Sequence, residues 1–253
     1  MPTAVITGAS AGLGRALATS LAERGWNLVI DARRPDRLAE VADELSRLCQ
    51  LRAIAGDVAD AQHRHRLADA VAEFGSLDLL VNNASTLGPT PLPPLTELAA
   101  DQLIDILRVN LVAPLALVQL TLPALTAADG GAGGLVVNVS SDAAVAHYPG
   151  WGGYGCAKAA LDHLTGTLAE ENPGLRWYGF DPGDMRTEMH QAAFPGEDIS
   201  DRPAPDSVVP ALLRLIDSRP PSGRYTSTAP ELTTVSGGSA NPELAAAGQE
   251  MPR

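Results

Sequence analysis

The chain has 253 residues, of which 45% are hydrophobic, and carries a formal net charge of −12. This length fits one large α/β domain, and the acidic balance argues against nucleic acid or an anionic membrane surface as a partner. No basic and apolar leader opens the sequence and no apolar run is expected to reach membrane-spanning length, so we expect a cytoplasmic protein. The two cysteines, Cys49 and Cys156, lack a CxxC or histidine cluster, so neither a disulfide nor a metal site is expected.

Short β-branched runs alternate with longer helical patterns, which is typical of a parallel sheet covered by helices on both faces. In chain order we predict strand 3–7, helix 14–24, strand 27–31, helix 35–49, strand 51–55, helix 60–74, strand 77–81, helix 99–127, strand 134–140, helix 152–172, strand 175–181, helix 206–218 and strand 224–226. We expect one domain over residues 1–227 and a loosely packed or partly disordered tail over 228–253.

Two proline-containing segments, 86–98 and 189–205, follow predicted strand ends. Ligands bind at the carboxyl ends of the strands in such sheets, so both segments are expected to border a binding site. The segment 189–205 shows no pattern of a long helix that could act as a lid.

The first predicted strand runs directly into the glycine-rich turn GASAGLG, residues 8–14, and then into a helix. A strand, turn and helix in this order place backbone N–H groups and a positive helix end where a pyrophosphate can bind. We expect Gly8 to allow the turn, Gly12 the close approach of the ligand, and Gly14 the packing of the helix on the strand. The spacing Gly-x3-Gly-x-Gly differs from the common dinucleotide fingerprint G-x-G-x-x-G. This difference narrows the set of protein families to which the chain can belong. The predicted contacts in this turn are Gly8, Ser10, Gly12, Leu13 and Gly14.

The second predicted strand ends in Asp31-Ala32-Arg33-Arg34, which bears on the choice of nucleotide. An acid here binds the ribose hydroxyls of NAD, whereas an arginine binds the 2′-phosphate of NADP. Because side chains alternate along a strand, we expect Asp31 to point to the other face and Arg33 and Arg34 to reach the pocket. We therefore expect NADP(H) to be preferred over NAD(H). The alternative is that both arginines are solvated charges at a helix start.

Polar residues also follow the third and fourth predicted strands. Asp57, with Val58 after it, is placed to accept a hydrogen bond from an adenine amino group. Asn82 and Asn83, followed by Ala84, can tie their strand to its neighbours and border a ribose. A simple turn is the competing interpretation of the asparagine pair.

Lys158 is the only lysine of the chain and follows Tyr154 by four residues. Residues four apart share one helix face, so the ammonium is expected beside the phenol, where it lowers the pKa of the tyrosine. Ser141 ends the fifth predicted strand and can reach the same place, where its hydroxyl could bind a substrate carbonyl while Tyr154 donates a proton. The alternative is a stray lysine on a solvated helix.

Asn110 lies inside the predicted helix 99–127, four residues before Pro114. The proline has no N–H, so the carbonyl of Asn110 lacks its helical partner and a kink is expected. A water shared with Lys158 could satisfy that carbonyl and reprotonate Tyr154 from solvent. A simple proline kink is the alternative.

These motifs occur together in a fixed order and spacing: Thr7-Gly8-x3-Gly12-x-Gly14, Asn82-Asn83-Ala84, Asn110, Ser141, Tyr154-x3-Lys158 and Pro182-Gly183-x3-Thr187. The set resembles the short-chain dehydrogenase/reductase family in its single-domain form. The resemblance implies a Rossmann-type doubly wound parallel sheet of about seven strands with helices on both faces, a three-layer sandwich. It also implies hydride transfer between a nicotinamide and the ketone or secondary alcohol of a small organic substrate.

The resemblance further implies a role for each residue. Tyr154 would be the general acid/base and Ser141 the carbonyl-orienting hydroxyl, while Lys158 would hold the nicotinamide ribose and lower the pKa of Tyr154. Asn110 would fix the relay water. The nicotinamide carboxamide would be lined by Pro182, Gly183, Met185 and Thr187. Family members are often dimers or tetramers formed through the helices that correspond here to 99–127 and 152–172.

Two other functions remain open at this stage. A sugar-nucleotide epimerase or dehydratase shares Tyr-x3-Lys but requires a different glycine spacing and a larger C-terminal domain. A non-catalytic NADP(H)-binding sensor or scaffold usually lacks one of the tyrosine, lysine or serine. Residues that could line a substrate pocket, or equally serve in packing, are His147, Tyr148, Trp151, Met185, His190 and Phe194. The aromatic rings in this set favour an apolar or ring-bearing substrate.

Overall fold

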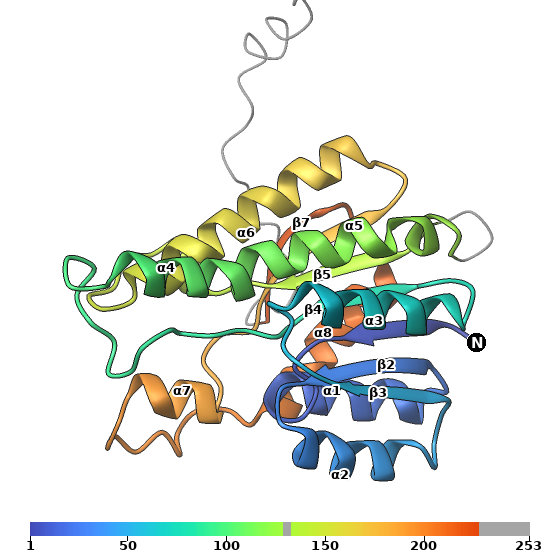
Figure 1. Cartoon of the computed structure of the whole chain (residues 1–253), viewed down its shortest axis with the longest axis horizontal. Coiled ribbons are helices and arrows are strands. Elements are labelled where there is room, and N and C mark those ends of the chain that lie inside the picture. The colour runs from blue at the N-terminus through green and yellow to red at the C-terminus, as the bar shows by residue number, and fades with distance from the viewer. Residues whose placement is uncertain (129–132, 228–253) are drawn as a thin grey trace, which may run out of the picture.

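The structure, a computed structural model, describes residues 1–128 and 133–227. Within these residues seven strands form one parallel sheet in the order β3-β2-β1-β4-β5-β6-β7 (Figure 1). The strands are β1 (Thr3–Ile6), β2 (Asn27–Ala32), β3 (Leu51–Ala55), β4 (Leu79–Asn82), β5 (Leu135–Val139), β6 (Arg176–Asp181) and β7 (Gly223–Thr226). The predicted parallel sheet is confirmed, and the tail predicted over 228–253 lies outside the described residues.

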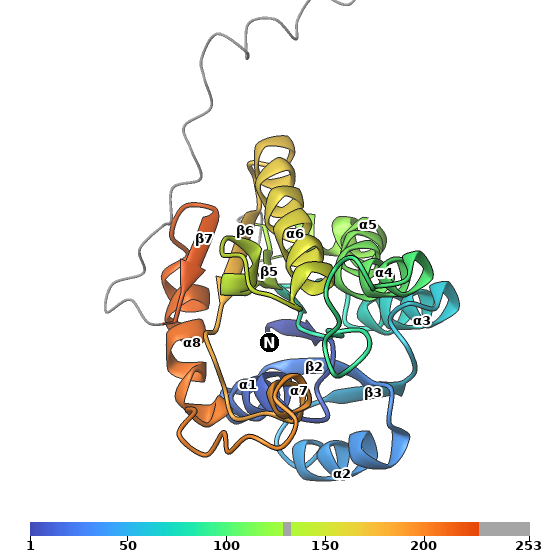
Figure 2. The ribbon, with the colours of Figure 1, turned by 90° about the vertical axis from the view of Figure 1, so that its left-hand side faces the viewer.

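Helices cover both faces of the sheet, as predicted (Figure 2). One layer contains α1, α2 and α8, and the other contains α3, α5 and α6. The helices are α1 (Gly12–Glu23), α2 (Pro35–Leu45), α3 (Ala61–Ala72), α4 (Ala100–Leu107), α5 (Ala113–Thr126), α6 (Gly152–Glu171), α7 (Glu188–Ala193) and α8 (Val209–Ser218). A π-helical turn, η1 (Arg108–Val112), joins α4 to α5, and 3-10 turns lie at η3 (Asp142–Ala144) and η4 (Pro205–Ser207).

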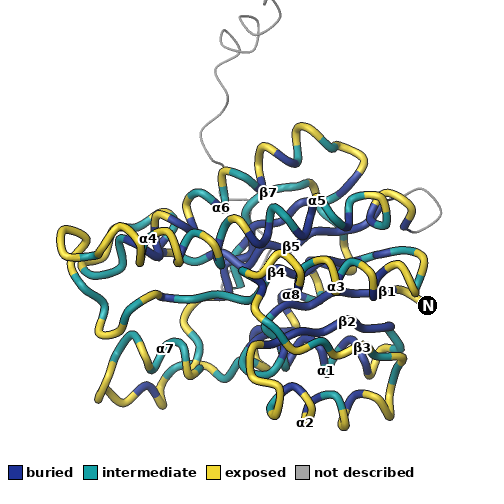
Figure 3. Tube along the Cα trace, in the orientation of Figure 1, coloured by how far each residue is buried: buried dark blue, intermediate teal, exposed yellow. Residues whose placement is uncertain are grey.

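The central strands are buried along their whole length (Figure 3). Strand β2 shows why its sequence is a continuous apolar run: Leu28 and Ile30 pack in the core on the α1 side, and Val29 packs in the core on the α3 side. A strand buried on both faces requires apolar residues at successive positions. Each such side chain contributes about 1.5–3 kcal/mol when it is fully buried.

The predicted helix 99–127 is not one regular helix. Its α-helical geometry is interrupted by the π-helical turn that contains Asn110, because Pro114 offers no N–H to the Asn110 carbonyl. The whole segment Ala100–Thr126 is nevertheless long and apolar enough to cross a membrane by length and composition, which corrects the expectation that no apolar run is that long. In the fold, α5 contacts α3, and η1 contacts α6.

The order of strands reverses between β1 and β4, and ligands bind at such a switch point beyond the carboxyl ends of the strands. Helix α7 lies at this end of the sheet (Figure 1), and its six residues agree with the expectation that segment 189–205 contains no long helix. The hydroxyl of Thr187 caps α7 by accepting a hydrogen bond from the backbone N–H of His190 at 3.1 Å. Helix α8 begins at Val209 rather than at residue 206, after η4.

Candidate active site

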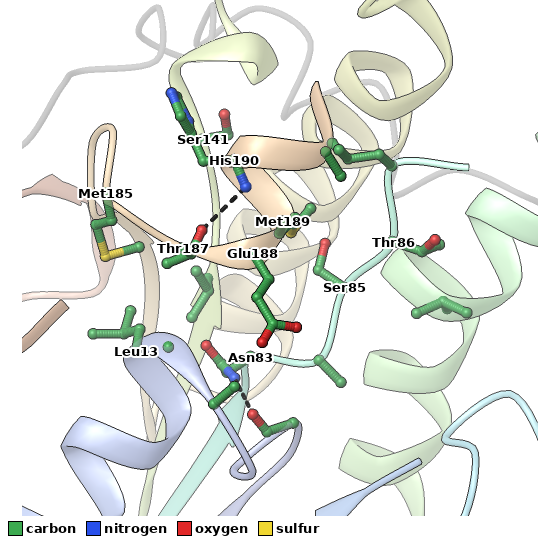
Figure 4. A pocket seen from close by; sticks show the side chains of 18 of the residues that line it. Leu13, Asn83, Ser85, Thr86, Ser141, Met185, Thr187, Glu188, Met189 and His190 are labelled. Carbon is green, nitrogen blue, oxygen red and sulfur yellow. Dashed lines mark hydrogen bonds between the residues drawn. The ribbon is translucent and has the colours of Figure 1, made fainter. Parts of the chain in front are cut away.

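A cavity of about 510 Å³ opens at the carboxyl ends of the strands (Figure 4). Its wall contains most of the residues that the sequence singled out: Gly8, Ser10, Gly12, Leu13, Arg33, Arg34, Asp57, Val58, Asn83, Ala84, Ser141, Tyr154, Lys158, Pro182, Gly183, Met185 and Thr187. Two predicted residues, Gly14 and Asn110, are not part of the wall but contact residues that are.

The glycine turn has the conformation and the packing that the sequence predicts for Gly8 and Gly14. Gly8 and Gly12 have positive φ angles of 69° and 56°, a backbone region that favours glycine. The predicted close packing at Gly14 is also present, because a Cβ atom there would lie 2.6 Å from the Gly8 oxygen and 2.5 Å from the Asn83 Nδ2 atom. Helix α1 therefore starts at Gly12 and directs its N-terminus into the cavity.

Asp31 is bound to the glycine turn and to helix α3. Its Oδ1 atom accepts a hydrogen bond from the Gly8 N–H at 2.8 Å, and its Oδ2 atom lies 2.8 Å from His63 Nε2. Arg66 donates to His63 Nδ1 at 3.1 Å, so Nε2 carries the proton that His63 donates to Asp31. Burial raises the pKa of Asp31, and the hydrogen bond from His63 opposes this rise. Asp31 therefore contacts α3 through His63, but it also lines the cavity, whereas the sequence predicted that it would point to the other face of the strand.

The arginines after β2 form a cationic cluster at the cavity rim. Arg33 and Arg34 are exposed, and Arg34 Nη2 lies 3.0 Å from a carboxylate oxygen of Glu188 on α7. Arg37, which the sequence analysis missed, binds the other oxygen of Glu188. It lies three residues beyond Arg34, at the spacing that places two side chains on one helix face, and this spacing could have revealed it.

The asparagine pair ties β4 to its neighbours, which excludes a simple turn. Asn82 Nδ2 donates to Asn138 Oδ1 of β5 at 2.8 Å. Asn83 Nδ2 donates to the Thr7 carbonyl at 2.7 Å, and the Thr7 hydroxyl accepts from the backbone N–H of Ala84 at 2.9 Å. The ends of β1, β4 and β5 are thereby held together beneath the cavity.

Tyr154 and Lys158 project from the same face of α6 into the cavity, as predicted. Lys158 is 2% exposed, and its Nζ atom donates to the Val139 carbonyl at 2.7 Å and lies 5.5 Å from the centre of the Tyr154 ring. Burial lowers the pKa of Lys158 to about 8. Burial also raises the pKa of Tyr154, whereas hydrogen bonds with Ser141 and Ser85 lower it. Within the protein alone, burial therefore outweighs the lowering that the sequence predicted for this tyrosine.

Asn110 contacts Ser85, a residue that the sequence did not single out. The Ser85 hydroxyl donates to Asn110 Oδ1 at 2.8 Å, and Asn110 Nδ2 donates to the Thr86 carbonyl at 2.8 Å. Ser85 also lowers the pKa of Tyr154, and both residues line the cavity, so polar groups lead from the π-helical turn toward the phenol. The signal was present, because Ser85 directly follows the motif Asn82-Asn83-Ala84.

The cavity near Tyr154 is lined with rings and acids. Trp151 packs edge-on against Tyr154 at 5.7 Å, and Phe194 stacks on Trp151 at 6.0 Å and on His190 at 4.9 Å. Asp142, a further residue missed from the sequence, accepts hydrogen bonds from Ser141 and Tyr148. Of the residues expected in the pocket, Trp151, Met185 and His190 line the cavity, whereas His147, Tyr148 and Phe194 are not part of its wall.

Comparison with known proteins agrees with this geometry. The family model described as short chain dehydrogenase matches residues 2–198. Sulfoacetaldehyde reductase 2 of Chromohalobacter salexigens is 34% identical over 189 residues, 73% of this chain and 73% of that protein. Sepiapterin reductase of Mus musculus is 35% identical over 200 residues, 75% of this chain and 76% of that protein.

Among solved structures, the alcohol dehydrogenase from the archaeon Thermococcus sibiricus, complexed with 5-hydroxy-NADP, is similar with a TM-score of 0.78 and 29% identity. The similarity covers 91% of this chain and 99% of that chain. Fold, site and relatives together define an oxidoreductase with a Rossmann fold. The chain belongs to the short chain dehydrogenase family.

Proposed function

We propose that the protein is an NADP(H)-dependent carbonyl reductase that transfers a hydride between the nicotinamide and a ketone or secondary alcohol of a small organic substrate. The observation that carries the proposal is the placement of Tyr154, Lys158 and Ser141 in one cavity with the glycine turn. Lys158 is buried and is held by the buried Val139 carbonyl, which a solvated helix face would not require.

The residues present fit a dinucleotide. The positive φ angles of Gly8 and Gly12 at the N-terminus of α1 form a cradle for a pyrophosphate. Asp57 and Val58 line the cavity where we place the adenine, and Asn83, Ala84 and Lys158 line it where we place the ribose of the nicotinamide. Pro182, Gly183, Met185 and Thr187 line the far end, where we place the carboxamide.

Arg33, Arg34 and Arg37 support a preference for NADP(H) over NAD(H). They line the cavity beyond β2, and although Asp31 lines it too, its carboxylate is already engaged by Gly8 and His63. A cationic cluster favours a 2′-phosphate, and an acid that already has two partners is a poor ligand for ribose hydroxyls.

When bound, the nicotinamide supplies or accepts the hydride. In the reductive direction Ser141 donates a hydrogen bond to the substrate carbonyl, and Tyr154 donates its phenolic proton to the same oxygen. Lys158 holds the nicotinamide ribose, and its ammonium charge favours the phenolate that remains on Tyr154. The hydroxyl of Ser85 and the amide of Asn110 extend this polar chain toward η1, where we place the water that returns the proton.

The ring cluster supports a substrate with an aromatic or other planar ring. Trp151 and His190 line the cavity beside Tyr154, and Phe194 supports both rings from behind. Ring faces bind planar apolar groups with useful specificity.

We further propose that the protein acts in the cytoplasm without nucleic acid or membrane partners, as a homodimer or homotetramer.

The test compares kcat/KM for NADPH and NADH with a panel of ring-bearing and aliphatic ketones. We expect turnover with NADPH, at least tenfold lower kcat/KM with NADH, and loss of activity in Tyr154→Phe with NADPH binding retained. Equal values for the two cofactors would contradict the NADP(H) assignment. NADPH binding without turnover of any ketone would favour the alternative, a non-catalytic NADP(H) sensor or scaffold.

A further inference from the structure

Arg224 lies on the last described strand, and its side chain reaches across β6 to the back of the active site. Its Nε atom donates to Asp162 Oδ2 at 2.9 Å, and its Nη2 atom donates to Asp181 Oδ2 at 2.8 Å and to the Ser141 carbonyl at 2.9 Å. One guanidinium therefore joins α6, β6 and the end of β5, three elements that are separate in the sequence.

The reach of Arg224 depends on Gly179. In the parallel ladder of β6 and β7, Gly179 is the partner of Arg224. A Cβ atom at Gly179 would lie 3.0 Å from Asp162 Oδ1 and 3.8 Å from the Arg224 Cγ atom. Glycine weakens a strand interior and often marks a close approach of another group. Here it leaves the space through which the guanidinium meets Asp162.

Each partner of Arg224 is linked, by the chain or by a hydrogen bond, to a group that we place at the reacting atoms. Asp162 follows Lys158 by four residues on α6, so the two lie on one helix face. Asp181 accepts a hydrogen bond from the Gly183 N–H at 3.0 Å through its other oxygen, which positions the turn after β6. The third partner is the backbone of Ser141 itself.

The side chains of Arg224 and its two carboxylate partners are largely shielded from solvent. The side chains of Arg224, Asp162 and Asp181 are 12%, 17% and 8% exposed. Burial raises the pKa of Asp162, while Arg224 and Lys158 oppose this rise. Buried ion pairs are weak evidence for stability, because the desolvation of the charges offsets their attraction. Their fixed hydrogen-bond directions, in contrast, hold groups in register.

We propose that Arg224 is a positioning residue that sets the placement of Ser141, Lys158 and the Gly183 turn relative to one another. The proposal rests on the function given above. Strand β7 contributes no residue to the cavity wall. Through Arg224 it would nevertheless fix the positions of three parts of that wall. A displacement of about 1 Å in such groups can reduce turnover on the order of 100-fold.

The test uses Arg224→Lys and Arg224→Met, with Arg24→Met as the matched control. Arg24 also makes two hydrogen bonds to a carboxylate, that of Asp217, but at the surface between α1 and α8. For Arg224→Met we expect kcat to fall roughly 100-fold with KM for NADPH changed less than about fivefold. Arg224→Lys keeps the charge but cannot span three acceptors, so its kcat should fall about tenfold.

Two readouts separate positioning from loss of fold. With NADPH deuterated at the transferred position, the isotope effect on kcat should increase in both Arg224 variants, because hydride transfer becomes the slow step. Hydrogen exchange at the Gly183 amide, measured without turnover, should accelerate at least tenfold relative to wild type and Arg24→Met. A folded Arg224→Lys protein with wild-type kcat, isotope effect and exchange would overturn the proposal.

The exchange experiment also distinguishes the two proposals. A wild-type protein without turnover on any ketone would contradict the proposed function, and faster Gly183 exchange in the Arg224 variants would still support the positioning role. An active wild type with unaltered Arg224 variants would overturn the positioning role alone.

Discussion

At the scale of the residue, Lys158 is the position where chemistry and burial are most closely linked. The ammonium is buried, has one backbone acceptor and lies beside the ring of the proposed acid/base. A compact ammonium with a pKa near 8 can hold a ribose hydroxyl and still titrate near neutrality. The 17 other positions with a permanent positive charge are all arginines, and a guanidinium does not titrate near neutrality.

Substituting Lys158 by arginine tests this residue directly. The variant keeps the positive charge, but a planar guanidinium cannot reproduce the 2.7 Å contact with the Val139 carbonyl while also serving the ribose. We expect kcat to fall roughly 100-fold while the circular dichroism spectrum of the folded protein is retained. A folded variant with near-normal kcat would contradict the role of the ammonium.

The buried amine also predicts a dependence of stability on pH. The pKa of Lys158 is about 8 in the folded protein and 10.5 is the value for an exposed lysine. Between these values the unfolded chain binds more protons, so folding becomes more favourable as the pH rises from 8 to 10.5. The cost of burying the ammonium is fully present below pH 8.

Urea unfolding of the wild type and Lys158→Met at pH 7, 9 and 10.5 measures this effect. The free energy of unfolding of the wild type should increase relative to that of the variant, by an amount on the order of 1–3 kcal/mol across the range. Other groups titrate in both proteins and largely cancel in the difference. A difference that stays flat or decreases with pH would be inconsistent with a lowered pKa.

At the scale of the element, helix α7 is coupled to helix α2 across the cavity. Glu188 of α7 binds both Arg34 and Arg37 of the cationic cluster (Figure 4 shows Glu188 at the cavity). Its carboxylate thus occupies the partners that we assign to a 2′-phosphate. The side chains of Arg34 and Glu188 are 57% and 66% exposed, so the interaction is weak and readily exchanged.

Glu188→Gln should therefore strengthen the binding of NADPH selectively. Loss of the carboxylate frees the arginines, and KM for NADPH should decrease about twofold to fivefold, the range expected for exposed ion pairs. KM for NADH should stay within error because NADH has no 2′-phosphate. Equal changes in KM for NADPH and NADH would show that Glu188 affects the position of α7 rather than the availability of the arginines for a 2′-phosphate.

At the scale of the whole molecule, we propose that α5 and α6 form the contact with a second copy of the chain. Val112, at the junction of η1 and α5, is apolar and 48% exposed. On α6 the exposed positions include Cys156, Ala159 and Gly166, which are small enough to allow close helix approach. A Cβ atom added at Gly166 would meet nothing within 4 Å, so this site faces away from the rest of the chain.

Gly166→Arg should separate such an oligomer without unfolding the protomer. Arginine is a good helix former, and the open surroundings of Gly166 accept its side chain in the single chain. We expect light scattering after size-exclusion chromatography to give a dimer or tetramer for the wild type and a monomer for the variant. Ala39→Arg on the exposed face of α2 is the control and should leave the mass unchanged. A wild-type monomer would contradict the proposed assembly.

Much of the fold could be predicted because its signals are local. The glycine turn, the alternation of strands and helices, and the four-residue spacing of Tyr154 and Lys158 each depend on neighbours in the chain. The interruption at η1 was also visible, since Pro114 removes one helical hydrogen bond wherever the helix lies. The sequence did not reveal the short helix α7, because its six residues make fewer than two turns and none of them is buried, so they carry little periodic pattern.

The sequence by itself determined the parallel sheet, the place of the glycine turn and the identity of the residues proposed to act at the reacting atoms, because backbone periodicity and motif spacing are properties of short segments. The tertiary structure alone decided which side chains meet across the fold. The contacts of Glu188 with Arg34 and Arg37 and of Arg224 with Asp162 join residues 62 to 154 positions apart. Such contacts depend on strand order and register, which set how distant segments align and which no local pattern encodes.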